Sequence, residues 1–245
     1  MVALGSNDAD LTSMRETAEL IRRLPEKIDA LVLAAGRFGR RRVVTAEGLE
    51  RTFAIYVVSR YLLAERLRPA LERTPNPVIL NLSGTGGIKA GRIHWDDLQL
   101  TRGYTMFKAT MQGARANDLL GTAFAAKASP VRYVLYNPLL VNSGMHRQLT
   151  QPWRSLTGAA AAAFGATVDS VAADLADLLD DPPPARLTAL RRAKAVPLTR
   201  REFDATDAAR LDGVLADVGE AERGLDELEQ PRLAYRLPLL LEDHG

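Results

Sequence analysis

Cysteine is absent from this 245-residue chain, and histidine is scarce, with three residues. Without cysteine the protein forms no disulfide and uses no thiolate chemistry, and a reducing compartment is permitted. The histidines His94, His146 and His244 are too scattered to indicate a metal site, and no His-Glu-x-x-His motif accompanies them. We therefore expect no metal cofactor.

Long hydrophobic runs and an excess of one charge are also missing. The most apolar run, residues 159–164, is far too short to cross a bilayer, and the N-terminus shows no signal-peptide pattern. The 32 Lys and Arg residues and 30 Asp and Glu residues leave a net charge of +2, spread along the chain. We expect a cytoplasmic protein without a nucleic-acid or membrane partner.

Apolar strand-like runs alternate with amphipathic helical segments along the chain. Strands are predicted at residues 29–35, 78–82, 131–136 and 187–190, and helices at 11–24, 46–72, 105–127, 168–179 and 205–218. The run 29–35, closed by Gly36, has the continuous apolar character of a strand buried on both faces. Strands alternating with helices of this length predict an α/β fold with a parallel sheet.

Five segments follow one another in the order and near spacing of a known family. They are IDALVLAAG (28–36), TAEGLERTFAIYVVSRYLL (45–63), VILNLSG (78–84), IHWDDLQL (93–100) and VRYVLYNPLLVNSGM (131–145). Through them the chain resembles the short-chain dehydrogenase/reductase (SDR) family, particularly relatives of retinol dehydrogenases. The resemblance implies a Rossmann-like doubly wound sheet over residues 1–218, followed by a C-terminal extension at 219–245. It also implies an oxidoreductase that uses NAD(P)(H).

The resemblance also marks the cofactor site. It brings Asp10 toward the adenine and assigns the cofactor wall to Ala34, Ala35, Gly36 and Pro138. The family's opening strand, G-x-x-x-G-x-G turn and helix have no counterpart here, so we expect a sheet truncated at its N-terminal side relative to the family. A start codon set too far downstream and a real loss of dinucleotide binding both stay open as explanations.

A Y-x-x-x-K pair offers one reading of the catalytic residues. If Tyr104 and Lys108 lay one turn apart on a helix, the lysine charge could lower the pKa of the phenol and make it a general acid or base. In this reading Ser83 completes the site.

A second register follows from the family's A-Y-x-x-S-K-x-A-N pattern. Residues 109–117 match it without a gap, which puts Thr110 at the tyrosine place and Ala114 at the lysine place. Tyr56 then stands at the family's asparagine and Gly84 at its serine, and Leu139 replaces a glycine beside Pro138. We favour this register, in which the family's catalytic tetrad is degraded.

Three functions are compatible with these observations. The first is a redox enzyme acting through Tyr104 and Lys108. The second is a cofactor-independent catalyst, of cyclase or dehydratase type, that acts on a small-molecule substrate with His94, Tyr104 or Lys108 as proton-transfer groups. The third is a non-catalytic partner of a complete oxidoreductase.

Self-association is expected in each case. The strand 29–35 would have an open edge, and the family commonly dimerises through the helices at 46–72 and 105–127. We predict a homodimer or larger, measurable by light scattering, with a second chain or the segment 219–245 covering that edge. The segment contains the apolar run 237–241.

Overall fold

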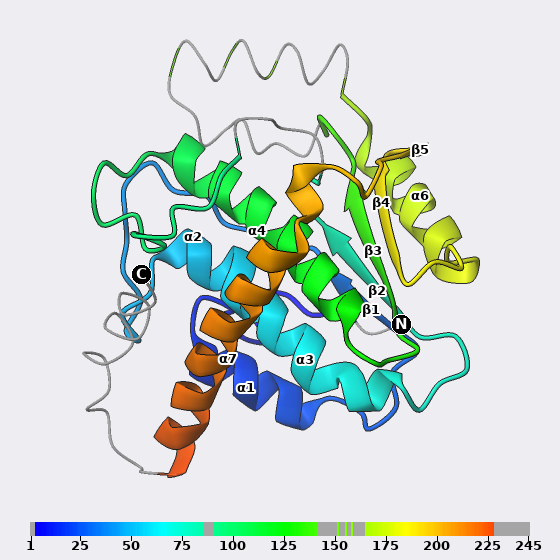
Figure 1. Ribbon diagram of the computed structural model, residues 1–245, viewed down its shortest axis with the longest axis horizontal. Helices are drawn as coiled ribbons and strands as arrows, with labels where there is room; N and C mark the ends of the chain where they lie inside the picture. Colours follow the sequence, from blue (N-terminus) through cyan, green and yellow to red (C-terminus); the bar gives the residue numbers. More distant parts are fainter. Residues whose placement is uncertain are drawn as a thin grey trace.

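The computed structural model describes residues 3–85, 91–141, 151, 155, 158 and 165–227, and every structural statement below concerns these residues. The elements (Figure 1) are α1 (Met14–Arg23), β1 (Ala30–Leu33), α2 (Arg51–Phe53), the π-helix η1 (Ala54–Val58), α3 (Ser59–Leu71), β2 (Val78–Leu82), α4 (Met106–Ala126), β3 (Arg132–Asn137), α6 (Val168–Asp180), β4 (Leu187–Arg191), β5 (Lys194–Ala195), the 3-10 helix η3 (Arg201–Phe203) and α7 (Ala205–Glu227).

The sheet confirms the predicted α/β class. Its strands are ordered β1-β2-β3-β4-β5; the first four are parallel, and β5 pairs antiparallel with β4. Leu80 lies level with Val32 on one side and Val134 on the other. All four parallel strands therefore end at the same edge of the sheet, where doubly wound folds place their ligands.

Helices cover the two faces of the sheet unequally. Helices α1, α3, α4 and α7 pack on one face, and α6 packs on the other (Figure 1). Helix α4 lies between the sheet and α7, so residues 111–121 are buried on all sides within one chain. These residues of the central helix are therefore covered by their own chain, and the dimer contact expected through this helix stays a prediction.

Strand β1 differs from its prediction. It is the edge strand of the sheet, and the side chain of Val32 is 40% exposed, so the strand is not buried on both faces. On the opposite face of β1, Leu33 is buried and Leu31 is half-buried. The apolar run was correctly placed. Helix α6 packs on a cluster formed by β2 and β3 that Ala30 of β1 joins, but Val32 stays exposed. The expected homodimer through this edge stays a prediction.

Helix starts are set by capping side chains. Thr105 accepts a hydrogen bond from the Lys108 N–H, so α4 begins at Met106, close to the prediction. The helix expected from residue 46 begins only at Arg51, because the Glu50 carboxylate caps the N–H groups of Thr52 and Phe53.

The C-terminal helix passes the predicted domain boundary at residue 218. Arg66 on α3 donates a hydrogen bond to the Gly219 carbonyl and forms an ion pair with Glu222. The helix therefore continues to pack on the domain as far as Glu222, and the apolar run at 237–241 lies outside the described residues. None of the described helices is both long and apolar enough to cross a membrane.

Candidate functional site

A cavity of about 430 Å³ opens at the carboxyl ends of the parallel strands. This volume lies within the range of about 300–1,000 Å³ that holds small organic ligands. Its wall is formed by Ala34, Gly36, Phe38, Tyr56, Arg60, Leu82, Ser83, Gly84, Thr110, Met111, Ala114, Asn137, Pro138, Leu139, Leu140 and Arg191. The wall is mainly apolar, with a few polar groups, and contains no carboxylate among these residues.

The strand register brings three of the polar groups together. Asn137 on β3 lies level with Arg191 on β4, and Ser83 follows β2 directly, where its N–H donates to the Tyr136 carbonyl. Side chains level with one another in a parallel sheet point to the same face. Ser83, Asn137 and Arg191 therefore point toward the cavity from three neighbouring strands.

Tyr56 reaches the cavity from the π-helix. A π-helix widens the backbone by one residue and frees a carbonyl, and such bulges are frequent at functional sites. Here the Nδ2 of Asn117 on α4 donates to the Tyr56 carbonyl at 2.8 Å and also to the Gly113 carbonyl at 2.8 Å. Asn117 thus ties the bulge to the central helix.

The Tyr56 phenol is held protonated. Burial raises its pKa above the ordinary value, and the nearby Arg60 charge acts in the opposite direction with a smaller effect. The ring lies between Phe38, in an edge-to-face contact at 5.2 Å, and the Arg60 guanidinium, 4.5 Å from the ring centre. Burial therefore favours the neutral phenol, which can donate a hydrogen bond.

Arg60 is the most deeply buried charged group in the wall of the cavity, with 2% of its surface exposed. Its guanidinium donates to the carbonyls of Ala35 and Leu82, each at 2.7 Å, and to the side chains of Asn81 and Asn117. No carboxylate of the described residues pairs with it, and burial lowers its pKa. A buried cation held only by neutral acceptors is costly to keep.

The tetrad positions of the favoured register meet around this cavity. Tyr56, Gly84, Thr110 and Ala114 all form part of its wall. The Thr110 hydroxyl donates to the Met106 carbonyl at 2.7 Å within its own helix. Neither a phenol nor an ammonium group therefore occupies the tyrosine and lysine places of that register.

The Tyr104–Lys108 pair does not have the predicted geometry. Tyr104 precedes the cap of α4, so the two residues do not share a helix face. The Tyr104 hydroxyl donates to the Gly39 carbonyl at 2.9 Å, and the Lys108 ammonium donates to the Gly103 carbonyl at 3.0 Å. Burial raises the pKa of Tyr104, whereas the catalytic reading required it to fall.

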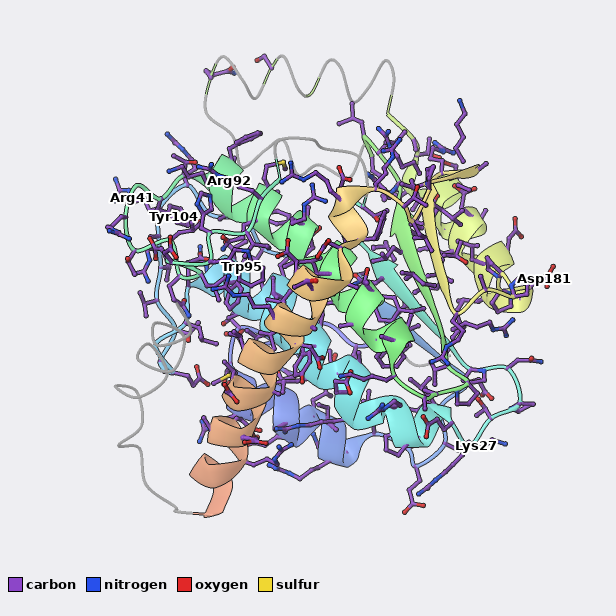
Figure 2. All side chains as sticks on the ribbon, viewed as in Figure 1. Lys27, Arg41, Arg92, Trp95, Tyr104 and Asp181 are labelled. Atoms are coloured by element: carbon purple, nitrogen blue, oxygen red, sulfur yellow. The ribbon has the colours of Figure 1, made fainter. Side chains whose placement is uncertain are left out.

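Both residues lie apart from the cavity wall. Figure 2 shows Tyr104 at the same end of the molecule as Arg41 and Arg92, among the loops before α4. His94, the other proton-transfer candidate, is also not part of the wall. Burial lowers the pKa of His94, and its backbone N–H donates to Gln112.

The cofactor residues separate into two groups. Ala34, Gly36 and Pro138 line the cavity, and the Ala35 carbonyl beside it accepts from Arg60. Asp10 lies elsewhere: it is exposed, and its carboxylate accepts from the Thr12 N–H just before α1. Among the described residues no strand is followed by a G-x-x-x-G-x-G turn, so they fit no pyrophosphate, and we derive no step through NAD(P).

Leu139 has the backbone conformation that favours glycine. Its φ angle is +62°, in the left-handed region, next to Pro138 in the cavity wall. The Asn137 side chain stabilises this turn by accepting from the Leu139 N–H at 2.8 Å. The glycine-like geometry is therefore kept, with leucine adding an apolar surface to the cavity.

Metal binding finds no support within the described ranges. No group of three His, Asp or Glu side chains there could hold an ion. His146 and His244 lie outside the described residues, as do Gly86 and Gly87 of the glycine-rich turn.

Comparisons with known proteins agree with the fold and with the resemblance. No family model matches the chain. Human dehydrogenase/reductase SDR family member 12 is 34% identical over 85 residues, which are 35% of this chain and 26% of that protein. The bovine protein of the same name is 28% identical over 139 residues, 52% of this chain and 43% of that protein. The chain thus matches less than half the length of these curated relatives.

A solved structure shows the same architecture. An uncharacterised protein from Mycobacterium paratuberculosis superposes with a TM-score of 0.55 at 21% identity, over 85% of this chain and 74% of that one. The fold is thus the Rossmann-like α/β class, with a cavity at the carboxyl ends of its strands. In the matched segments the chain is similar to members of the short-chain dehydrogenase/reductase family, as the sequence resemblance indicated. A closer relation to retinol dehydrogenases stays a prediction.

Sequence reasoning missed the buried polar cluster of Arg60, Asn81 and Asn117. Arg60 and Asn81 lie within the apolar stretches VVSRYLL and VILNL. A polar residue inside an apolar run has to find buried partners. That signal was present, but only the fold shows that the three residues meet.

Proposed function

We propose that this chain binds a small molecule in the cavity at the carboxyl ends of its strands, without the family's tyrosine–lysine hydride-transfer chemistry. The observation that carries this proposal is which residues stand at the positions of the family's catalytic tetrad. Thr110 and Ala114 stand where the favoured register expects a phenol and an ammonium group, and Tyr56 is a protonated donor. Similarity to the short-chain dehydrogenase/reductase family associates the chain with NAD(P)-dependent oxidoreductases in general.

The residues of the cavity wall can bind a ligand through apolar contacts and hydrogen bonds. Phe38, Met111 and Leu139 supply apolar surface, while Tyr56 and Ser83 supply hydrogen-bonding groups. Such a mixture of apolar wall and few polar groups is typical of sites that bind small organic molecules. We propose a cytoplasmic binding protein, acting alone or beside a complete oxidoreductase.

Nucleotide affinity tests the proposal. We expect the 245-residue protein to bind NADPH and NADH with a Kd of about 1 mM or weaker, because the described residues provide no turn of N–H groups for the pyrophosphate. Titration followed by NADPH fluorescence measures this. Micromolar affinity together with NADPH-dependent reduction of carbonyl compounds would contradict the proposal.

Replacement of Tyr104 separates the two catalytic readings. Tyr104→Phe is expected to cost about 1 kcal/mol of stability, from the lost hydrogen bond to Gly39, and to change any activity by less than about tenfold. Steady-state kinetics and urea unfolding of the same preparation measure both effects. A fall in kcat of about 10² at unchanged stability is the result expected of a catalytic phenol, and it would defeat this account.

A further inference from the structure

Three residues that line the cavity each have a buried polar atom without a hydrogen-bond partner among the described residues. These atoms are the Nε of Arg60, the Nε of Arg191 and the hydroxyl oxygen of Ser83. Buried polar groups are normally satisfied, and each exception costs about 1–3 kcal/mol. All three atoms belong to residues that line one cavity.

Charge in the cavity has one sign. Arg60 and Arg191 both contribute to the wall, and no carboxylate of the described residues forms an ion pair with either. The neighbouring arginine, Arg192, shows the contrast: it lies 3.6 Å from Asp174, outside the wall. An acceptor that brings negative charge would offset the cost of the buried Arg60 cation and pair with the half-buried Arg191.

We propose that the ligand of this cavity carries an anionic head group, a carboxylate or a phosphate, on an apolar body. This inference rests on the proposed binding function and specifies its ligand class. The head group lies by Ser83, Arg60 and Arg191, and the body lies against Phe38, Met111 and Leu139. Arginine suits either anion because its N–H groups match two oxygens at once.

Calorimetric titration with octanoate, octyl phosphate and octan-1-ol tests the head group on a constant body. We expect at least one anion to bind about tenfold more tightly than the alcohol. This ratio corresponds to a binding free energy of about 1.4 kcal/mol, the size expected for a charge-assisted contact. The two anions distinguish carboxylate from phosphate as the preferred head. An alcohol that binds as tightly as both anions overturns the anionic inference but leaves the binding function standing.

Two variants test which wall residues bind the anionic head group, and neither changes Arg60 or its hydrogen bonds. Arg191→Gln is expected to weaken binding of the preferred anion about tenfold, and Ser83→Ala several-fold, while binding of octan-1-ol stays nearly constant. Ser83→Ala removes a hydroxyl that has no partner, so the fold should keep its stability. Arg192→Gln removes the same charge outside the cavity and serves as the matched control.

Two outcomes overturn the inference at this level. One is unchanged anion affinity in both cavity variants, and the other is an equal loss in the Arg192→Gln control. Failure of all three probes to bind also overturns the anionic inference. The proposed binding function is tested separately, by a ligand-soaked crystal.

Discussion

Alanine at position 113 is expected to destabilise the protein by about 1–3 kcal/mol and to disrupt ligand binding in the cavity. A Cβ atom built on Gly113 would lie 2.4 Å from Cδ1 of the Tyr56 ring, far inside contact distance. The ring cannot move aside freely, because Phe38 and Arg60 pack against it. The overpacking exceeds the gain of about 0.8–1.0 kcal/mol that alanine brings to a helix.

Gly213 provides the matched control for this substitution. It also lies within a helix, α7, but nothing comes within 4 Å of a Cβ built there. Gly213→Ala is therefore expected to stabilise the protein by up to about 1 kcal/mol and to leave binding unchanged. Urea unfolding and titration of both variants check the pair. Equal stabilisation by the two alanines would show that Tyr56 does not occupy the place described.

Loss of the Asn117 amide should have the second large effect. Asn117 is fully buried, and its side chain joins the Tyr56 carbonyl on the π-helix to Asn81 on β2 and to Arg60. Asn117→Ala leaves these groups without a partner and opens a small void. We expect a loss of about 3 kcal/mol, because each unsatisfied buried group costs about 1–3 kcal/mol.

Asn76→Ala is the control for that variant. Asn76 is exposed in the loop between α3 and β2, so its replacement should change stability by no more than about 0.5 kcal/mol. Urea unfolding followed by circular dichroism compares the two. If Asn117→Ala unfolded at the same denaturant concentration as Asn76→Ala, the polar cluster would have no role in holding the site.

The fold was readable from local patterns because each strand has a short apolar run and each helix a periodic one. Strand β2 has the predicted bounds, and β4 and α6 differ from theirs by one residue. Strand β1 shows the limit of this reasoning. An apolar run predicts that a strand exists, but burial depends on which helices reach it, and α6 does not cover Val32.

The site was readable only in part. Register arguments placed Thr110 and Ala114, and both now lie in the cavity wall with Tyr56 and Gly84. Spacing alone suggested that Tyr104 and Lys108 share a helix face, and they do not, because the Thr105 cap starts the helix after Tyr104. The partners of Arg60 lie just after β1, on β2 and on α4, far apart in sequence, so no local pattern could assemble them.

A crystal soaked with octanoate tests most directly where ligand chemistry takes place in this protein. The account predicts density for the ligand in the cavity, with its carboxylate at Ser83 and Arg191 and its chain passing Thr110. Density beside Tyr104 and Lys108 with the cavity left unoccupied would contradict it.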